Sequence, residues 1–112
     1  MDSKLIKISS DTYKNHLKWP KVSEDSEWVY FGKGDDIDVK IVHDCLSAFV
    51  NEPKTYVAID RSNSFECIGS KLPDTLKPLL GSTNFVLWNA TFCKAIEFSD
   101  IGVFRIGEKA ST

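Results

Sequence analysis

Histidine, arginine and cysteine are scarce in this chain of 112 residues, and each shortage argues against a class of site. The cysteines stand at positions 45, 67 and 93 with no C-x-x-C pair, so neither a disulfide framework nor a zinc ribbon is predicted. We expect Cys45, Cys67 and Cys93 to be reduced, mostly buried, small apolar side chains. The two histidines, His16 and His43, leave little scope for a metal site or a general base, and we expect both on the surface.

Long apolar runs are absent as well. No stretch approaches the roughly 20 apolar residues that cross a bilayer. The first residues, MDSKLIKISSD, lack the apolar stretch of about 7 to 15 residues that marks a signal peptide. We therefore expect a soluble, cytoplasmic protein, and the length predicts a single domain over residues 1–112.

Motifs for catalysis and cofactor binding are missing too. GKGDD, residues 32–36, is not part of a phosphate-binding glycine pattern, and its two acids would repel phosphate. The same acids and Asp38 lack the spacing and the distal Glu of a calcium loop. On a helix, His43 and Cys45 would point about 160° apart, which prevents a nucleophile and base pair. The sequence therefore predicts no enzyme, no cofactor and no metal.

The charge that is present is unevenly distributed. Residues 1–21 carry +3, residues 24–44 carry −5, and residues 45–112 carry no net charge. Only two arginines occur, and VFRIG, which faintly resembles the aromatic strand of RNA-binding sheets, lacks glycine and basic residues at the expected spacing. The acidic third of the chain should repel nucleic acid and attract a partner with a basic surface.

In the first half, KLIKI at residues 4–8 is typical of a short edge strand or an extended arm. SSDTYKNHLKW predicts a short helix capped by Ser9 or Ser10 and ended by Pro20. EWVYF, residues 27–31, predicts a strand. The apolar residues of positions 37–51 fall on one wide arc at 100° per residue, which predicts a largely buried helix. Asp35 or Asp36 would cap it, with Asp38 in its first turn.

The second half contains five strand-length runs separated by turn-forming stretches, namely TYVAID, SFECI, NFVLWNA, FCKAIEF and IGVFRIG. LPDTLKPLL interrupts them with one or two helical turns. Links this short join strands antiparallel. We therefore predict an α+β fold: a twisted antiparallel sheet of five or six strands, with one long and one or two short helices, and the helix of residues 37–51 across one face.

EWVYF raises the question of function, because its aromatics lie between two groups of acids. In a strand Trp28 and Tyr30 share one face while Val29 and Phe31 share the other, so only one pair need enter the core. One interpretation is structural, with the acids solvating loops and capping a helix. The other is a protein interface of aromatic anchors and acids. Its candidate residues are Glu24, Asp25, Glu27, Trp28, Tyr30, Asp35, Asp36 and Asp38, with His43 and Asp44 as outer members.

An amphipathic helix leading into YVAIDRSNSFECIG, followed by FVLWNATFCKAIEFSDIGVFRIGE as two close hairpins, resembles the immunity proteins of bacterial polymorphic toxin systems. Those of contact-dependent growth inhibition are the nearest comparison, and the resemblance covers roughly residues 27 to 107. It implies a protein that neutralises a cognate toxin domain, commonly a nuclease, by blocking its active site or its access to substrate. It transfers no functional residue by position.

Two other classes stay open. A small regulatory module could self-associate as a homodimer through apolar strands such as FVLW, residues 85–88, and would be insensitive to salt. An enzyme could use dispersed residues around a cleft, for example His43, Tyr56, Asp60 and Glu66, and would show titratable groups of shifted pKa.

Overall fold

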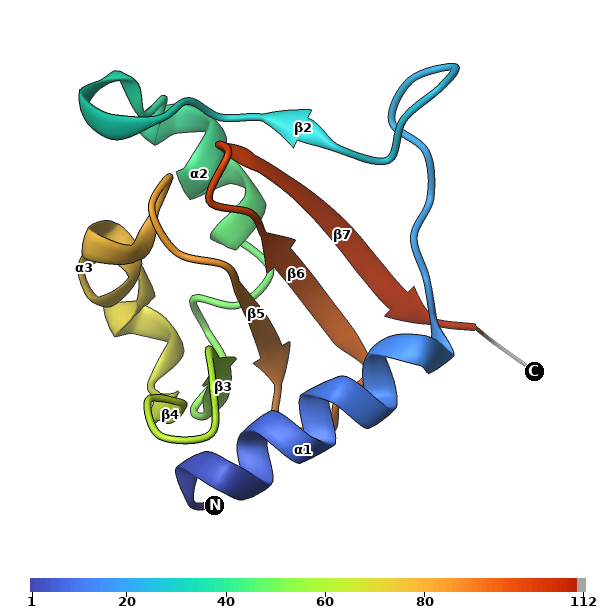
Figure 1. Cartoon of the computed structure of the whole chain (residues 1–112), viewed down its shortest axis with the longest axis vertical. Coiled ribbons are helices and arrows are strands. Elements are labelled where there is room, and N and C mark those ends of the chain that lie inside the picture. Colours follow the sequence, from blue (N-terminus) through green and yellow to red (C-terminus); the bar gives the residue numbers. More distant parts are fainter. Residues whose placement is uncertain (111–112) are drawn as a thin grey trace.

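A computed structural model describes residues 1–110 of the chain, shown in Figure 1. Within that range seven strands form one antiparallel sheet in the order β1–β7–β6–β5–β3–β4, and β2 pairs with the same outer side of β7 as β1. The strands are β1 (Leu17–Lys18), β2 (Val29–Tyr30), β3 (Thr55–Ala58), β4 (Phe65–Cys67), β5 (Phe85–Asn89), β6 (Lys94–Phe98) and β7 (Val103–Lys109).

The helices of residues 1–110 are α1 (Ser3–Tyr13), α2 (Val39–Leu46) and α3 (Leu72–Leu76). Four 3-10 turns accompany them: η1 (Lys14–His16), η2 (Gly34–Asp36), η3 (Gly69–Lys71) and η4 (Lys77–Leu79). The predicted α+β class is confirmed, and so are the five strands of the second half. The strand predicted over residues 27–31 is confirmed as the two-residue β2, and the sheet exceeds the expected six strands because the unpredicted β1, also of two residues, joins it.

The sheet is covered on both faces, which explains the uninterrupted apolar run FVLW in β5. Phe85 and Leu87 pack into the core under α2 and α3, whereas Val86 and Trp88 pack on the α1 side. A strand buried on both faces needs no polar alternation. The suggestion that FVLW could join two copies of the chain is therefore wrong, because β5 lies between β3 and β6 with these four side chains buried.

The N-terminal arm is a helix, which corrects the prediction for KLIKI. Asp2 caps α1 by accepting a hydrogen bond from the Leu5 amide at 2.8 Å. Ser10 lies inside α1 instead of capping a later helix, and its Oγ accepts a hydrogen bond from the buried Trp88 indole N–H at 2.8 Å. Ile6 and Ser10 are four residues apart and form the buried stripe of α1. A five-residue alternation was too short to distinguish this stripe from a strand.

The helix predicted over residues 37–51 is shorter. Asp38 caps α2 by accepting from the Lys40 and Ile41 amides, while Asp35 and Asp36 lie in η2. The Asp38 amide donates to the Phe31 carbonyl at 2.7 Å, and Phe31 is a core residue, so this bond fixes where the helix begins. Residues 47–51 continue as turns.

Candidate partner-binding surface

The acidic segment of residues 24–44 follows one margin of the molecule. It begins in the loop after β1, passes β2 along the outer side of β7, and continues through η2 into α2 (Figure 1). Eight of the ten predicted interface residues are exposed: Glu24, Asp25, Tyr30, Asp35, Asp36, Asp38, His43 and Asp44. Glu27 and Trp28 are only partly exposed.

The predicted alternation of EWVYF is confirmed in β2. Phe31 is 1% exposed and contacts Phe98 and Phe104 in the core, and Val29 packs against the same cluster. Tyr30 points the other way and is 64% exposed. The strand therefore presents a large aromatic side chain to solvent between the two groups of acids.

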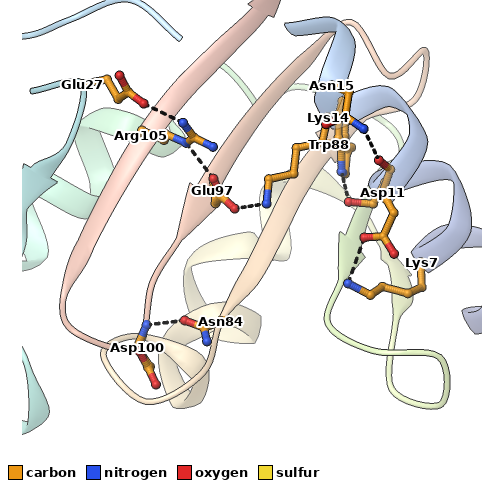
Figure 2. A network of polar contacts seen from close by, with 11 residues as sticks. Lys7, Asp11, Lys14, Asn15, Glu27, Asn84, Trp88, Glu97, Asp100 and Arg105 are labelled. Carbon is orange, nitrogen blue, oxygen red and sulfur yellow. Dashed lines mark hydrogen bonds and ion pairs between the residues drawn. The ribbon is translucent and has the colours of Figure 1, made fainter. Parts of the chain in front are cut away.

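Glu27 is held by an ion-pair network on the α1 face of the sheet (Figure 2). The Arg105 guanidinium donates through Nη1 to Glu27 Oε1 and through Nε to Glu97 Oε1, both at 2.6 Å. The second oxygen of Glu97 is paired with the Lys14 ammonium from the end of α1. Arg105 and Glu97 are directly opposite each other on β7 and β6, so the sheet register creates the pair.

Trp28 and Trp19 complete this arrangement, which we call the Arg105 network. The Arg105 guanidinium lies 4.1 Å from the ring centroid of Trp19 and 4.9 Å from that of Trp28. A Cβ at position 107 would come within 2.6 Å of the Trp19 ring, so glycine allows Trp19 to lie against β7. Stacked, doubly paired arginine is typical of a structural anchor. Trp28 and Glu27 thus tie the acidic loop to the sheet, and their predicted interface role stays a prediction.

The other end of the acidic segment is not fastened in this way. Five ion pairs occur between residues 1 and 110, and none involves a residue between Val29 and Asp44. Asp38 uses Oδ1 as the cap of α2, whereas the side chains of Asp35, Asp36 and Asp44 accept no hydrogen bond within the described residues. These carboxylates face solvent without an internal cation.

A groove of about 410 Å³ opens beside this end of the segment, between η2, α2, α3 and η4. Its apolar lining comes from Ile37, Val39, Val42 and Leu80, and its charged and polar lining includes Asp35, His43, Asp74 and Lys77. Val42 is buried, while Val39 is 60% exposed. The helical periodicity predicts Val39 on the buried arc, which is wrong for this side chain. The sequence does not indicate Asp74 either, because nothing in it predicts that α3 lies beside α2.

The groups considered for catalysis do not converge. Burial, with a smaller contribution from Asp44, raises the pKa of the Cys45 thiol to about 12, so it stays protonated at neutral pH. Tyr56 is buried on the α1 side, whereas His43 lies on α2, on the opposite side of the sheet. The Asp60 carboxylate accepts hydrogen bonds from Asn63 and from the Ser62 amide, which lower its pKa. Glu66 is paired with the N-terminal ammonium of Met1 at 2.6 Å, which lowers the pKa of Glu66.

The three cysteines carry free thiols, but only Cys45 is buried, so the expectation of mostly buried cysteines is wrong for Cys67 and Cys93. His16 and His43 are exposed, as predicted. Residues 1–110 contain no cluster of three or more His, Cys, Asp or Glu side chains that could hold a metal ion. No helix in the same range is long and apolar enough to cross a membrane.

Comparison of the chain with protein-family models, with curated proteins and with solved structures finds no match. The resemblance to immunity proteins therefore stays a prediction. Any functional assignment has to be carried by the residues and surfaces described above.

Proposed function

We propose that this chain is an immunity-type inhibitor, which binds a basic toxin domain through the margin formed by residues 24–44. The toxin is most simply a nuclease, and binding would block its active site or its access to nucleic acid. The observation that carries the proposal is the exposure of Tyr30 in a segment whose carboxylates, Glu27 excepted, have no cation within the described residues. We place its action in the cytoplasm.

The electrostatic reason is that nucleases bind phosphate in basic clefts, and carboxylates can occupy the places of phosphates. Complementary charge raises association rate constants from about 10⁶ toward 10⁸ M⁻¹s⁻¹ at low salt. A fast association matters for an inhibitor that must act before the toxin does. An exposed aromatic residue such as Tyr30 supplies the apolar contact that charge alone does not provide.

A homodimer is the alternative from another class, but the strand proposed for it is internal. No outer strand in the described part of the chain replaces FVLW, because β1 and β2 have two residues each, and β4, at the opposite edge of the sheet, has three residues with the charged Glu66 at its centre. We therefore keep self-association as an outcome of the test.

An affinity pull-down tests the proposal. The tagged chain is incubated with a lysate of its source organism at low salt and at about 0.5 M salt, where exposed charges are strongly screened. We expect one basic protein in stoichiometric amount at low salt and much less of it at high salt. Recovery of the chain alone at both salt concentrations would contradict the inhibitor and favour a self-associating module.

A further inference from the structure

The groove beside α2 has the composition of an anchor pocket in a protein interface. Aliphatic side chains from three separate segments line it, and one of them, Val39, leaves 60% of its surface to solvent. Protein interfaces take most of their binding energy from a few residues, often aromatic, that are seated in well-packed pockets and surrounded by contacts that exclude water. We call the groove lined by Ile37, Val39, Val42, Leu80, Asp35 and Asp74 the anchor groove.

We propose that the anchor groove receives one aromatic or large aliphatic side chain of a basic protein, and that lysine or arginine residues beside this side chain meet Asp35 and Asp74. The inference rests on the proposed function, since it takes the partner to be the same basic protein. It goes further by locating the point of strongest contact in the groove between α2 and α3, which Tyr30 does not line.

The charges around the anchor groove favour this occupant over an anionic one. The elements that form it, with their immediate caps, carry five carboxylates and four lysines, and none of these nine groups is ion-paired within residues 1–110. The carboxylates are Asp35, Asp36, Asp38, Asp44 and Asp74, and the lysines are Lys33, Lys40, Lys71 and Lys77, with His43 also lining the groove. Of the four lysines, only Lys77 lines the groove itself, together with the carboxylates Asp35 and Asp74. The local field therefore attracts a cationic segment.

A second hollow, beside Trp28, provides the contrast. It measures about 210 Å³ and is lined by Lys7 and Lys14 among others. Lys7 is paired with Asp11 at 3.0 Å, and Lys14 is paired with Glu97, so both ammonium groups already have partners. The charged groups there are engaged by the fold, whereas Asp35 and Asp74 in the anchor groove are not.

The test uses synthetic peptides and the isotope-labelled full chain. The first peptide is capped Lys-Lys-Phe-Lys-Lys, the second has Ala in place of Phe, and the third has Glu in place of each Lys. Binding is followed by amide chemical-shift changes in nitrogen–proton correlation spectra. We expect saturable changes centred on residues 37–43 and 73–80 with the Phe peptide, about tenfold weaker binding of the Ala peptide, and none of the Glu peptide.

A pair of exposed valines supplies a matched control. Val39 is 60% exposed in the anchor groove and Val22 is 61% exposed in the loop before β2. Val39→Lys should weaken binding of the Phe peptide by about tenfold or more, because it places a positive charge, like those of the peptide's lysines, in the apolar lining. Val22→Lys should change the affinity by less than about twofold. Equal effects of the two substitutions, equal binding of the Phe and Ala peptides, or no saturable shift in the groove would each overturn the inference.

Failure here is distinguishable from failure of the proposed function. If the pull-down recovers a basic protein while the peptides give no shift in the anchor groove, the proposal for the groove is rejected and the proposed binding through residues 24–44 is retained. If the peptides bind as expected but the pull-down returns only the chain itself, the inhibitor is wrong and the groove is a peptide-binding site of another kind.

Discussion

The two ends of the acidic segment have similar compositions but differ in whether the fold supplies ion-pair partners for their carboxylates. At one end, Glu27 and Trp28 are held by Arg105, which also pairs with Glu97 and stacks on Trp19. At the other end, Asp35, Asp36 and Asp44 have no ion pair within residues 1–110 and lie beside an apolar groove. The comparison teaches that acids next to aromatics are not a functional signal by themselves. What separates an anchor from a binding surface is whether the fold already supplies the counter-charge.

The largest expected effect on the free energy of unfolding comes from removing Arg105, which pairs with Glu27 at one end of the acidic segment. Arg105→Ala would leave Glu27 and Glu97 facing each other without their shared cation and would remove the stacking on both tryptophans. Losing one partner of a fully buried pair costs about 3–5 kcal/mol, and because solvent reaches 15–29% of these side chains we expect about 2–3 kcal/mol here. Urea unfolding followed by tryptophan fluorescence measures this loss.

The only other arginine is the matched control. Arg61 is exposed, and its side chain makes no ion pair or hydrogen bond within the described residues. Arg61→Ala should change the free energy of unfolding by less than about 0.5 kcal/mol. Similar losses in both variants would show that the Arg105 network is not the anchor we describe.

A smaller loss is expected on the same face from Ser10→Ala. This substitution leaves the Trp88 indole N–H, which is fully buried, without its acceptor. An unsatisfied buried donor costs about 1–3 kcal/mol, partly offset by the better helix propensity of Ala. The matched control is Ser9→Ala, because the Ser9 hydroxyl makes no hydrogen bond within residues 1–110. In thermal unfolding, Ser10→Ala should lower the midpoint temperature more than Ser9→Ala does. A midpoint unchanged in both would contradict the buried bond.

The unfastened end should tolerate substitution. Asp35→Asn combined with Asp36→Asn removes two exposed charges with no internal partner, so the free energy of unfolding should change by less than about 0.5 kcal/mol. Urea unfolding in parallel with Arg105→Ala makes the comparison direct. A loss as large as that of Arg105→Ala would mean that these acids are structural.

The smallest effect concerns Asp60, whose carboxylate accepts hydrogen bonds within its own turn. Hydrogen bonds from Asn63 and the Ser62 amide lower the pKa of Asp60 below its ordinary value in the folded chain. A lowered folded pKa contributes stability that is present above the unfolded value and is lost as the pH falls through the folded value. Asp60→Asn should therefore lose less stability than the wild type on acidification from pH 5 to about pH 2. Asp100→Asn, whose carboxylate accepts no hydrogen bond within residues 1–110, should follow the wild type in thermal scans.

Much of the fold could be predicted because it depends on local patterns. The strands of the second half alternate or form apolar runs between turn residues, and short links make them antiparallel. The alternation of EWVYF also predicted that Tyr30 and Phe31 lie on opposite faces, and only the structure shows that Phe31 is the one that enters the core. The N-terminal helix was missed because its buried stripe consists of only Ile6 and Ser10, and the serine is explained only by Trp88, 78 residues away.

The site was less predictable, because the tertiary structure decides which charged side chains form ion pairs. Glu27 and Arg105 are 78 positions apart, and only the register of β6 and β7 together with the course of the loop after β1 brings them together. Nothing local distinguishes Glu27 from Asp35. The groove likewise depends on α3 lying beside α2, which no spacing in the sequence indicates.

The most direct measurement compares the retention of a basic partner by two charge-neutralised forms of the chain in the low-salt pull-down. One form carries Asp35→Asn, Asp36→Asn and Asp44→Asn, and the control carries Asp100→Asn and Glu108→Gln, two exposed carboxylates outside the segment. We predict that the first form folds with wild-type stability but retains about a tenth or less of the partner, while the control retains nearly all of it. Equal retention by both forms would contradict the claim that the unfastened end of the acidic segment is the binding surface.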